Sequence, residues 1–269
     1  MRNEDESERW NNDEWRKALA DGEVAPKIMR RLFRLLPAAP RCGMCLAPFR
    51  GLGSRIVGIA GFRMSRKNPN WCVMCFEKAP MGGAEVDTGV LFADIRGYTS
   101  LSEAHQPAEI ARLLNRFYGA ATNVLAGHDA VIDKLVGDQV MALFVPGFAG
   151  ADYISKMVSA AEDLLRSVGY GGDEEAWLPL GVGLDCGNAY VGNVGSGDVK
   201  DFTALGDVVN TAARLQSQAK PGQIVMSERV YGVVSERFPD AAEVSLELKG
   251  KSGPVAARVV DPGAPVAVR

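Results

Sequence analysis

The hydrophobic pattern is most regular in the larger, C-terminal part of the chain. Residues 89–95 (GVLFADI) form an apolar run that contains a single acid, which predicts a buried strand. Residues 107–126 carry apolar side chains at intervals of about 3.6 residues, which predicts an amphipathic helix. Together they predict a sheet with at least one helix packed on it.

A hairpin is predicted directly after this helix. The strand-like runs 130–136 and 139–145 are separated only by Gly137 and Asp138, which indicates a tight turn with Asp138 at its tip. The order strand, helix, hairpin, helix, strand predicts an α+β fold with a ferredoxin-like βαββαβ core, its helices on one face and added elements at the end. The later elements are expected as a helix over 151–168, strands over 178–185 and 189–195, and a helix that begins near Asp207.

The regular pattern begins near residue 85, and the chain upstream has a different composition. Residues 81–89 (MGGAEVDTG) contain several turn-forming residues and are interpreted as a linker. We therefore expect an N-terminal helical segment over 1–40, a four-cysteine metal-binding region over 41–84, and one large domain over 85–262.

A basic amphipathic segment occupies residues 27–36 (KIMRRLFRLL). Ile28, Leu32 and Leu35 would share one helical face opposite the arginines. Such a helix can lie on a membrane or on a partner helix. Because it spans fewer than three turns, we favour a surface helix docked on its own chain.

The overall composition limits the classes of partner. The chain has 269 residues, 47% of them hydrophobic, and a formal net charge of −3, so extended nucleic-acid binding is not expected. No apolar run reaches the length of about 18 residues that a membrane-spanning helix needs, and the acidic start MRNEDESERW does not resemble a signal peptide. We expect a cytoplasmic protein without a transmembrane segment.

Four of the five cysteines form two C-x2-C pairs, Cys42 with Cys45 and Cys72 with Cys75. Two such pairs can supply four thiolates to a structural zinc site. An iron–sulfur cluster and a redox-active dithiol are the alternatives. The metal would either only hold together a segment too small for its own core, or would sense oxidation or metal supply. Cys186 lies in a predicted strand and is interpreted as a small buried apolar group.

Two aspartates stand in apolar surroundings, where an unpaired charge is costly. Asp94 ends the first strand, and Asp138 is at the hairpin tip. In the predicted sheet this tip lies beside the C-terminal end of the first strand, so the two acids should be neighbours. A pair of hard cations would neutralise them, which suggests nucleotide chemistry.

Four signatures follow one another over about 170 residues: FADIRGYTSLSE, KLVGDQVMALF, YVGNVGSGDVKDFTALGDVVNTAARLQSQA and LKGKSG. In this order they resemble the catalytic domain of class III nucleotidyl cyclases, the adenylate and guanylate cyclases. The resemblance covers about residues 86–260. It implies a reaction in which the ribose 3′-hydroxyl of a nucleoside triphosphate attacks its own α-phosphate and expels pyrophosphate.

The resemblance also implies two Mg²⁺ or Mn²⁺ ions at each active site. Asp94 and Asp138 match the family's two metal-binding aspartates, and the Ile95 carbonyl matches the third ligand. Oxygen ligands suit hard divalent ions. One ion would lower the pKa of the attacking hydroxyl, and the other would neutralise charge on the phosphates.

Further positions match the family's phosphate-binding groups. Gly97, Tyr98 and Thr99 form a turn that leads towards a helix, so their N–H groups would face the β- and γ-phosphates. Lys249 in LKGKSG matches the lysine that binds the terminal phosphates, and Lys251 is the nearby alternative.

Lys134 and Thr203 match the family's base-recognition positions. A lysine can donate to adenine N1, and a threonine hydroxyl can accept from the 6-amino group. Guanine-selective members typically carry glutamate and cysteine there, so the pair predicts ATP as the substrate. Without the resemblance, the simpler interpretation is a solvated lysine and a hydroxyl bonded to nearby backbone.

Asn210 and Arg214 lie one helical turn apart in GDVVNTAAR. By resemblance, Asn210 orients the ribose and Arg214 stabilises the charge that develops on the α-phosphate, because a guanidinium can contact two phosphoryl oxygens. On spacing alone, a capping asparagine and a solvated arginine are the simpler interpretation.

In this family the site lies at a dimer interface, and this chain carries every required role. The resemblance therefore implies a homodimer with two equivalent sites. Two alternatives stay open, namely a cyclase of other base specificity (cGMP or a cyclic pyrimidine nucleotide) and a non-catalytic nucleotide-sensing module. Residues 171–175 (GGDEE) resemble part of the diguanylate cyclase signature, but they follow a predicted helix and lack its phenylalanine, so we interpret them as a solvated acidic loop.

Overall fold

The structure is a computed structural model that describes residues 12–22, 27–36, 40–196, 199–247 and 253–262. The chain divides into two compact units. Unit 1 contains the N-terminal residues up to Asp87 together with Val145–Ala151 and Ala189–Leu205, and unit 2 contains Thr88–Phe144, Asp152–Asn188 and the residues from Gly206 onward.

The strands form one twisted sheet in which the spatial order differs from the order along the chain. The order is β2-β3-β1-β4-β6-β8-β7, and β5 pairs with β4. Pairing is antiparallel for β1 with β3, β2 with β3 and β4 with β5, and parallel for β4 with β6. The strands are β1 (Gly82–Ile95), β2 (Val131–Val136), β3 (Gln139–Phe144), β4 (Leu180–Ser196), β5 (Val199–Leu205), β6 (Ile224–Ser227), β7 (Ala242–Leu246) and β8 (Val255–Val260).

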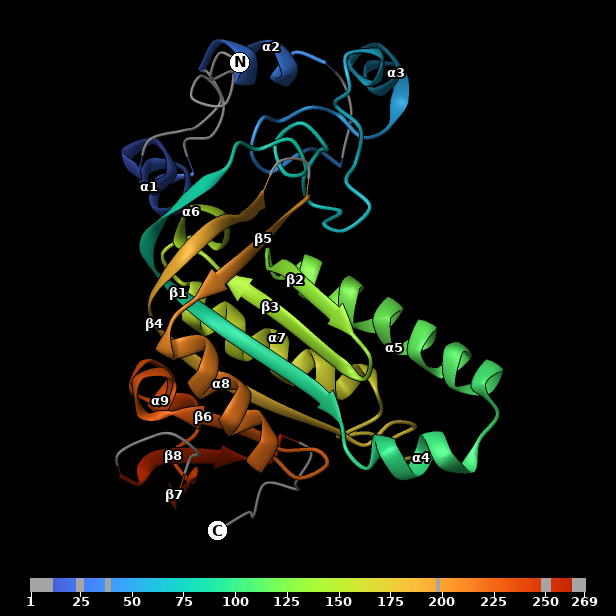
Figure 1. Ribbon diagram of the computed structural model, residues 1–269, viewed down its shortest axis with the longest axis vertical. Coiled ribbons are helices and arrows are strands. Elements are labelled where there is room, and N and C mark those ends of the chain that lie inside the picture. Colours follow the sequence, from blue (N-terminus) through green and yellow to red (C-terminus); the bar gives the residue numbers. More distant parts are fainter. Residues whose placement is uncertain (1–11, 23–26, 37–39, 197–198, 248–252, 263–269) are drawn as a thin grey trace. The chain divides into compact units, whose positions relative to one another are not determined.

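The helices alternate with these strands as the pattern predicts. Helix α5 contacts α7, β2 and β3, and Figure 1 shows α7 behind β1 and β3. The α+β class and the βαββαβ order are therefore confirmed. The helices are α1 (Asn12–Asp21), α2 (Lys27–Arg34), α3 (Gly51–Ile59), α4 (Tyr98–Ala104), α5 (Pro107–Gly127), α6 (Pro146–Ala149), α7 (Tyr153–Ser167), α8 (Asp207–Gln218) and α9 (Glu228–Val234), followed by a 3₁₀ turn at Ser235–Arg237.

Local sequence explains the best-defined elements. Four consecutive residues of β1, from Val90 to Ala93, are buried because the strand is covered on both faces. Helix α5 begins with a capping box, in which Gln106 and Glu109 satisfy each other's backbone N–H groups, and Pro107 occupies the first turn. These features explain why the strand and the helix were recognisable without any structure.

Unit 1 has a core of its own. Aromatic rings from distant parts of the chain meet there, with centroid separations of 6.3 Å for Trp15 and Phe202, 5.2 Å for Phe76 and Phe202, and 5.4 Å for Trp71 and Phe148. The four-cysteine segment therefore shares its hydrophobic core with the β4–β5 hairpin and with α6.

Polar contacts fix the same arrangement. The Asn193 side chain donates to the carbonyls of Ala79 and Pro80, both over 2.9 Å. Lys200 also donates to the Ala79 carbonyl, over 2.6 Å. The end of the cysteine segment is thus tied to both strands of the hairpin.

Two expectations about segments were wrong. Residues 81–89 are not a linker, because they form the first half of β1. The strands expected over 178–185 and 189–195 are one continuous strand, β4. In the first case the glycines allow close strand packing, since a β-carbon at Gly83 would lie 2.3 Å from the Val191 carbonyl oxygen.

Helix α2 also differs from expectation. It docks on its own chain, but through Phe33, whose ring lies 5.1 Å from that of Phe62, and not through the face that contains Leu32 and Leu35. Those two leucines are 60% and 80% exposed. The side chain of Ile28 lies outside the described side chains. Within the described ranges, no helix is long and apolar enough to cross a membrane.

Candidate active site

The two predicted metal-binding aspartates are neighbours at one end of the sheet. Asp94 is the penultimate residue of β1, and Asp138 lies in the turn between β2 and β3. Asp94 pairs opposite Gln139, and the Ile95 N–H donates to the Asp138 carbonyl over 3.2 Å. The hairpin thus brings together two acids that are 44 residues apart in the sequence.

The electrostatic surroundings of these acids are negative. Burial raises the pKa of Asp94, the nearby Arg96 charge opposes this increase, and the Asp138 carboxylate raises the pKa further. The Arg96 guanidinium donates to the Asp94 carboxylate. One guanidinium facing two carboxylates leaves an excess of negative charge that a divalent cation can balance.

A positive φ shapes the turn that follows β1. Gly97 has φ of 72° and precedes α4, and this conformation favours glycine. Tyr98 is half-buried, and Thr99 is exposed at the start of α4. The turn therefore follows Asp94 by three residues in the chain and leads into a helix, as the sequence predicts.

Tyr118 is a neighbour of the acids that sequence reasoning missed. Its hydroxyl donates to the Gly137 carbonyl over 2.5 Å and so fixes the hairpin tip to α5. Burial raises the pKa of Tyr118, and the proximity of Tyr98 and Asp138 adds to the increase. A single tyrosine on a helix carries no sequence signal that would identify this contact.

Lys134 lies in β2 beside a further acid, Asp133, that sequence reasoning missed. Its ammonium nitrogen lies 3.1 Å from a carboxylate oxygen of Asp133, which is completely buried. The register of β2 against β3 shifts between Ile132 and Lys134, which marks a β-bulge at Asp133. The available signal was an acid inside the apolar run VIDKLV.

Thr203 lies in β5, in unit 1, opposite Gly192 of β4. Its side chain is buried. Two residues further on, Leu205 is half exposed at the end of the strand. Thr203, the position predicted to recognise the base, is therefore buried near the open end of the β4–β5 hairpin. The exposed aliphatic side chain of Leu205 lies at that end.

Helix α8 carries Asn210 and Arg214 on one side. Asn210 is exposed, Arg214 is half-buried, and the opposite side of the helix is buried. A β-carbon at Gly183 would lie 2.2 Å from the Gln216 nitrogen, so glycine allows α8 to pack directly on β4. Sequence reasoning missed Gly183, although a glycine inside the strand pattern LGVGLD signals a close approach.

Not all predicted site residues meet. Within the described ranges, no hydrogen bond or ion pair joins Asn210 or Arg214 to Asp94 or Asp138. Lys249 and Lys251 lie outside the described residues. The candidate site residues of one chain thus form two separate groups. One contains the acids Asp94 and Asp138, and the other contains Asn210 and Arg214 of α8.

The four cysteines converge in unit 1. The sulfur atoms of Cys42, Cys45, Cys72 and Cys75 all lie within 4.8 Å of one another, and those of Cys45 and Cys72 are 3.8 Å apart. A tetrahedron with Zn–S bonds of about 2.3 Å has edges of about 3.8 Å, so the spacing fits four-coordinate metal. The Cys72 N–H points at the Cys42 sulfur over 3.3 Å, as an amide that stabilises a thiolate would.

Cys186 and the acidic loop behave as expected. Cys186 is buried in β4 and is not a member of the four-cysteine group. Residues 171–175 are exposed between α7 and β4. Neither feature contributes to a candidate site.

A family model of the adenylate and guanylate cyclase catalytic domain matches residues 84–259. The chain belongs to this family. A curated adenylate cyclase of Anabaena cylindrica is 33% identical over 190 residues, which make up 64% of this chain and 38% of that protein. The chain spans about a third of the length of the curated relatives it matches, so the activity of those whole proteins is not transferred to it.

Solved cyclases share the fold. The guanylyl cyclase Cya2 is 28% identical, with a TM-score of 0.60, and the match covers 70% of this chain and 98% of that one. The adenylyl cyclase CyaB from P. aeruginosa is 30% identical, with a TM-score of 0.56, and the match covers 66% of this chain and 95% of that one. This cyclase domain therefore resembles members of both base specificities.

Class III cyclases use divalent metals, and the donor set of this cyclase suits them. Asp94 and Asp138 offer carboxylate oxygens at the same end of the sheet, with backbone oxygens beside them. Hard divalent ions prefer such ligands. The four cysteines form a second group that can hold a metal of different, softer preference.

Proposed function

We propose that this cyclase converts ATP into 3′,5′-cyclic AMP and pyrophosphate at a site shared by two copies of the chain. The observation that carries the proposal is the adjacency of Asp94 and Asp138, two acids from different elements that together carry an excess of negative charge. Charge of this kind suits the magnesium or manganese complex of a nucleoside triphosphate.

Asp94, Asp138 and the Ile95 carbonyl would hold two Mg²⁺ or Mn²⁺ ions. When bound, these ions supply Lewis-acid activation of the ribose 3′-hydroxyl and neutralise phosphate charge. The 3′-hydroxyl gives up its proton to water and its oxygen forms a bond to the α-phosphorus. The bond from this phosphorus to the oxygen that bridges the α- and β-phosphates breaks, and pyrophosphate leaves. The turn formed by Gly97, Tyr98 and Thr99 would bind the β- and γ-phosphates, together with Lys249.

Helix α8 would supply the transition-state residues. Asn210 is exposed and can orient the ribose, and Arg214 lies one turn later on the same side. A guanidinium at that place stabilises the negative charge that develops on the α-phosphate oxygens. Since the acids of the same chain make no polar contact with this pair, the partner copy would provide the opposite half.

Adenine recognition rests on Lys134 and Thr203. The Lys134 ammonium is partly exposed and is held by Asp133, so it can donate to adenine N1. A threonine hydroxyl can accept from the 6-amino group. Because relatives of both specificities match, a cyclase for GTP or a pyrimidine nucleotide is the alternative, and a non-catalytic nucleotide sensor is the next one.

Exposed aliphatic residues support the homodimer. Leu135 and Val136 follow Lys134 in β2, with 38% and 63% of their surface exposed. In the β4–β5 hairpin Val199 is 81% exposed and Leu205 52% exposed. Aliphatic side chains next to the base-recognition positions suit an interface between two copies.

We also propose a structural Zn²⁺ at Cys42, Cys45, Cys72 and Cys75, since the sulfur spacing fits a tetrahedral site and an N–H group supports Cys42. The division into a helical segment (1–40), a metal-binding region (41–84) and the cyclase domain (85–262) belongs to the same proposal. An iron–sulfur cluster is the alternative, and it would give a brown protein that contains sulfide.

Product identification tests the activity. The full chain is incubated with ATP, GTP, CTP or UTP and Mn²⁺, and we expect cyclic AMP as the main product. Asp138→Ala should abolish turnover and leave the thermal transition in place, whereas Asp173→Ala in the exposed loop should keep full activity. A different main product would refute adenine selectivity, and turnover by Asp138→Ala would refute the metal assignment.

A further inference from the structure

Positive charge is concentrated in one stretch of this chain. Residues 27–76 contain ten lysine and arginine residues and no aspartate or glutamate, although the whole chain has a net charge of −3. The stretch contains α2, α3 and both cysteine pairs. Its surface therefore carries a local positive field that the overall charge hides.

Helix α3 exposes its large aliphatic side chains, which a helix docked on its own chain would bury. Leu52, Ile56 and Ile59 recur at i, i+4 and i+7 and are 76%, 64% and 89% exposed. The opposite side buries only Gly53 and Val57. An amphipathic helix normally buries its large aliphatic side chains, so this exposed side is available for another apolar surface.

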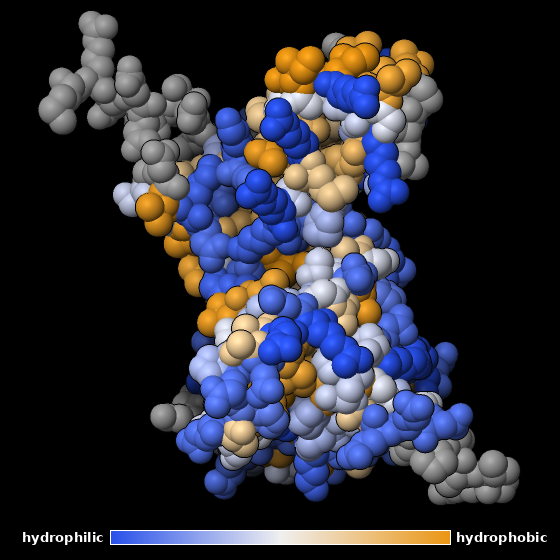
Figure 2. Space-filling view, turned by 90° about the vertical axis from the view of Figure 1, so that its right-hand side faces the viewer, coloured by the Kyte–Doolittle hydropathy of each residue, from blue (hydrophilic) through white to orange (hydrophobic). Residues whose placement is uncertain are grey.

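Helix α2 lies close to α3 and also exposes aliphatic side chains. A β-carbon at Gly53 would lie 3.2 Å from the β-carbon of Leu36, so the residues directly after α2 pack on the buried side of α3. Leu32 and Leu35 are largely exposed as well. Figure 2 shows orange side chains gathered at the top of the molecule with blue ones between them. We call this surface the α2–α3 face, made up of Leu32, Leu35, Leu52, Ile56 and Ile59.

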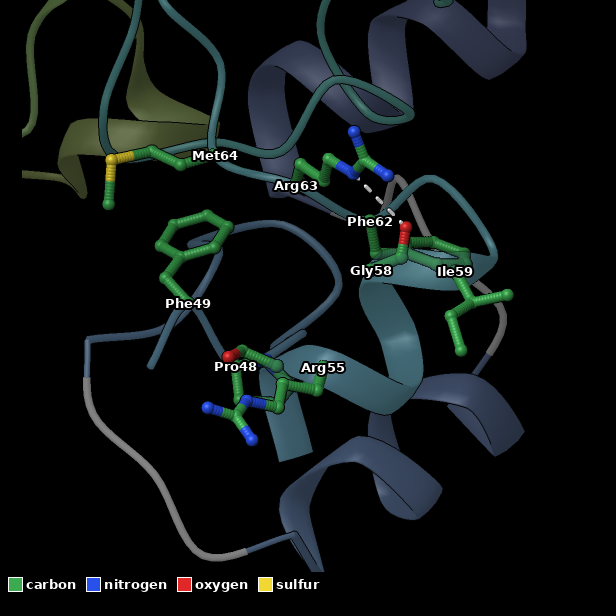
Figure 3. Close-up of a pocket in the computed structure, with 9 residues that line it drawn as sticks. Pro48, Phe49, Arg55, Gly58, Ile59, Phe62, Arg63 and Met64 are labelled. Atoms are coloured by element: carbon green, nitrogen blue, oxygen red, sulfur yellow. Dashed lines mark hydrogen bonds between the residues drawn. The ribbon is translucent and has the colours of Figure 1, made fainter. Parts of the chain in front are cut away.

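Exposed arginines lie on the same segments as the α2–α3 face. Arg31, Arg34, Arg50, Arg55 and Arg63 are all exposed. Beside α3 lies a pocket of about 370 Å³, and Figure 3 shows Arg55 and Arg63 in its lining together with Phe49, Ile59 and Met64. Exposed aliphatic side chains with guanidinium groups on the same segments are typical of surfaces that insert into the interface of an anionic bilayer.

We propose that the α2–α3 face docks this cyclase on the surface of a membrane that contains anionic lipids. The aliphatic side chains enter the boundary between headgroups and acyl chains, and the arginines pair with lipid phosphates. Two copies of this chain would repel each other through such a basic face. Single-stranded nucleic acid would favour exposed aromatic side chains for base stacking, but the exposed side chains are aliphatic.

Vesicle co-sedimentation of the full chain tests this proposal. We expect binding to phosphatidylcholine vesicles that contain phosphatidylserine, no binding to pure phosphatidylcholine vesicles, and weaker binding as salt increases. Arg55→Glu with Arg63→Glu should weaken binding by about tenfold or more, since each basic residue near an anionic surface contributes roughly a fivefold factor. Ile56→Ser with Ile59→Ser should also weaken binding strongly.

Matched variants separate this role from folding. Val233→Ser removes an exposed aliphatic side chain from α9, and Arg112→Glu reverses an exposed charge on α5, and both should bind vesicles like the wild type. All four variants should keep the cyclase activity of the wild type. Equal binding to neutral vesicles, a lower oligomeric state of Ile56→Ser with Ile59→Ser, or a preference for RNA over vesicles would each overturn the proposal.

Discussion

At the scale of single residues, Asp133 has a role that the motif alone did not show. We expect Asp133→Asn to raise the KM for ATP by about tenfold and to change kcat little, because the Lys134 ammonium then loses a charge-assisted hydrogen bond that helps to hold it in place. Steady-state kinetics measure both parameters. Asp129→Asn, which removes an exposed acid paired with Lys156, is the matched control. An unchanged KM with a lowered melting temperature would limit Asp133 to a structural role.

At the scale of elements, a polar contact joins the end of α5 to α7. His128 lies 2.9 Å from Asp163, and Arg166 also contacts this acid. Burial by itself would raise the pKa of Asp163, but the hydrogen bonds from His128 and Arg166 outweigh it and lower the pKa. The ion pair therefore contributes stability above the unfolded-state pKa of about 3.9 and loses it as pH falls through the lower folded-state value.

Urea unfolding at a series of acidic pH values checks this contact. Since both side chains are partly exposed, we expect Asp163→Asn to lower the free energy of unfolding by only about 0.5 kcal/mol near neutral pH. The difference from wild type should disappear in strong acid. Asp173→Asn in the exposed loop is the control. A difference that persists at the lowest pH would show that charge is not the cause.

Hydrogen bonds join a second pair of elements, the cysteine segment and the β4–β5 hairpin. Removing the proposed metal with a chelator should loosen the backbone that ends at Ala79 and Pro80, which accept hydrogen bonds from Asn193. We expect faster amide hydrogen exchange in β5, including Thr203, and unchanged exchange in the buried centre of β1. Cys186→Ala should respond to the chelator like wild type. Unchanged exchange in β5 would show that the metal supports only its own loops.

At the scale of the whole molecule, the proposed site needs two chains. Asp138→Ala and Arg214→Ala should each be inactive alone, because each removes one half of both sites. Mixed in equal amounts, they should recover about a quarter of wild-type activity, since half of the dimers are mixed and each of these has one intact site. Activity assays on the separate and mixed proteins measure this. A mixture as inactive as its components would contradict the shared site.

The sequence predicted the larger part of the fold for a physical reason. The buried run ending at Asp94, the long period-3.6 helix and the Gly137-Asp138 turn are each defined by neighbours in the chain, so periodicity and turn chemistry suffice. The order of the elements, interpreted as a βαββαβ sheet, then predicts that Asp138 lies beside Asp94. The C-x2-C spacing holds the two cysteines of each pair close to one another, so the sequence also predicted that the two pairs form one group.

Local rules gave the wrong result where distant parts of the chain decide the structure. The glycines of residues 81–89 suggested a linker, but they permit close packing of β1 on β4. The apolar face of α2 was expected to dock, but Phe33 docks instead. Tyr118 and Gly183 gained their roles only from partners that the folded chain brings to them.

Short-range pattern and chemistry were thus enough to predict the order of the elements, the acidic pair and the grouping of the four cysteines. The folded structure was needed to show that the cysteine segment shares its core with the β4–β5 hairpin, and that α2 and α3 leave their aliphatic sides exposed. Which face of an element is buried depends on the neighbours available to cover it, and amphipathic spacing does not contain that information.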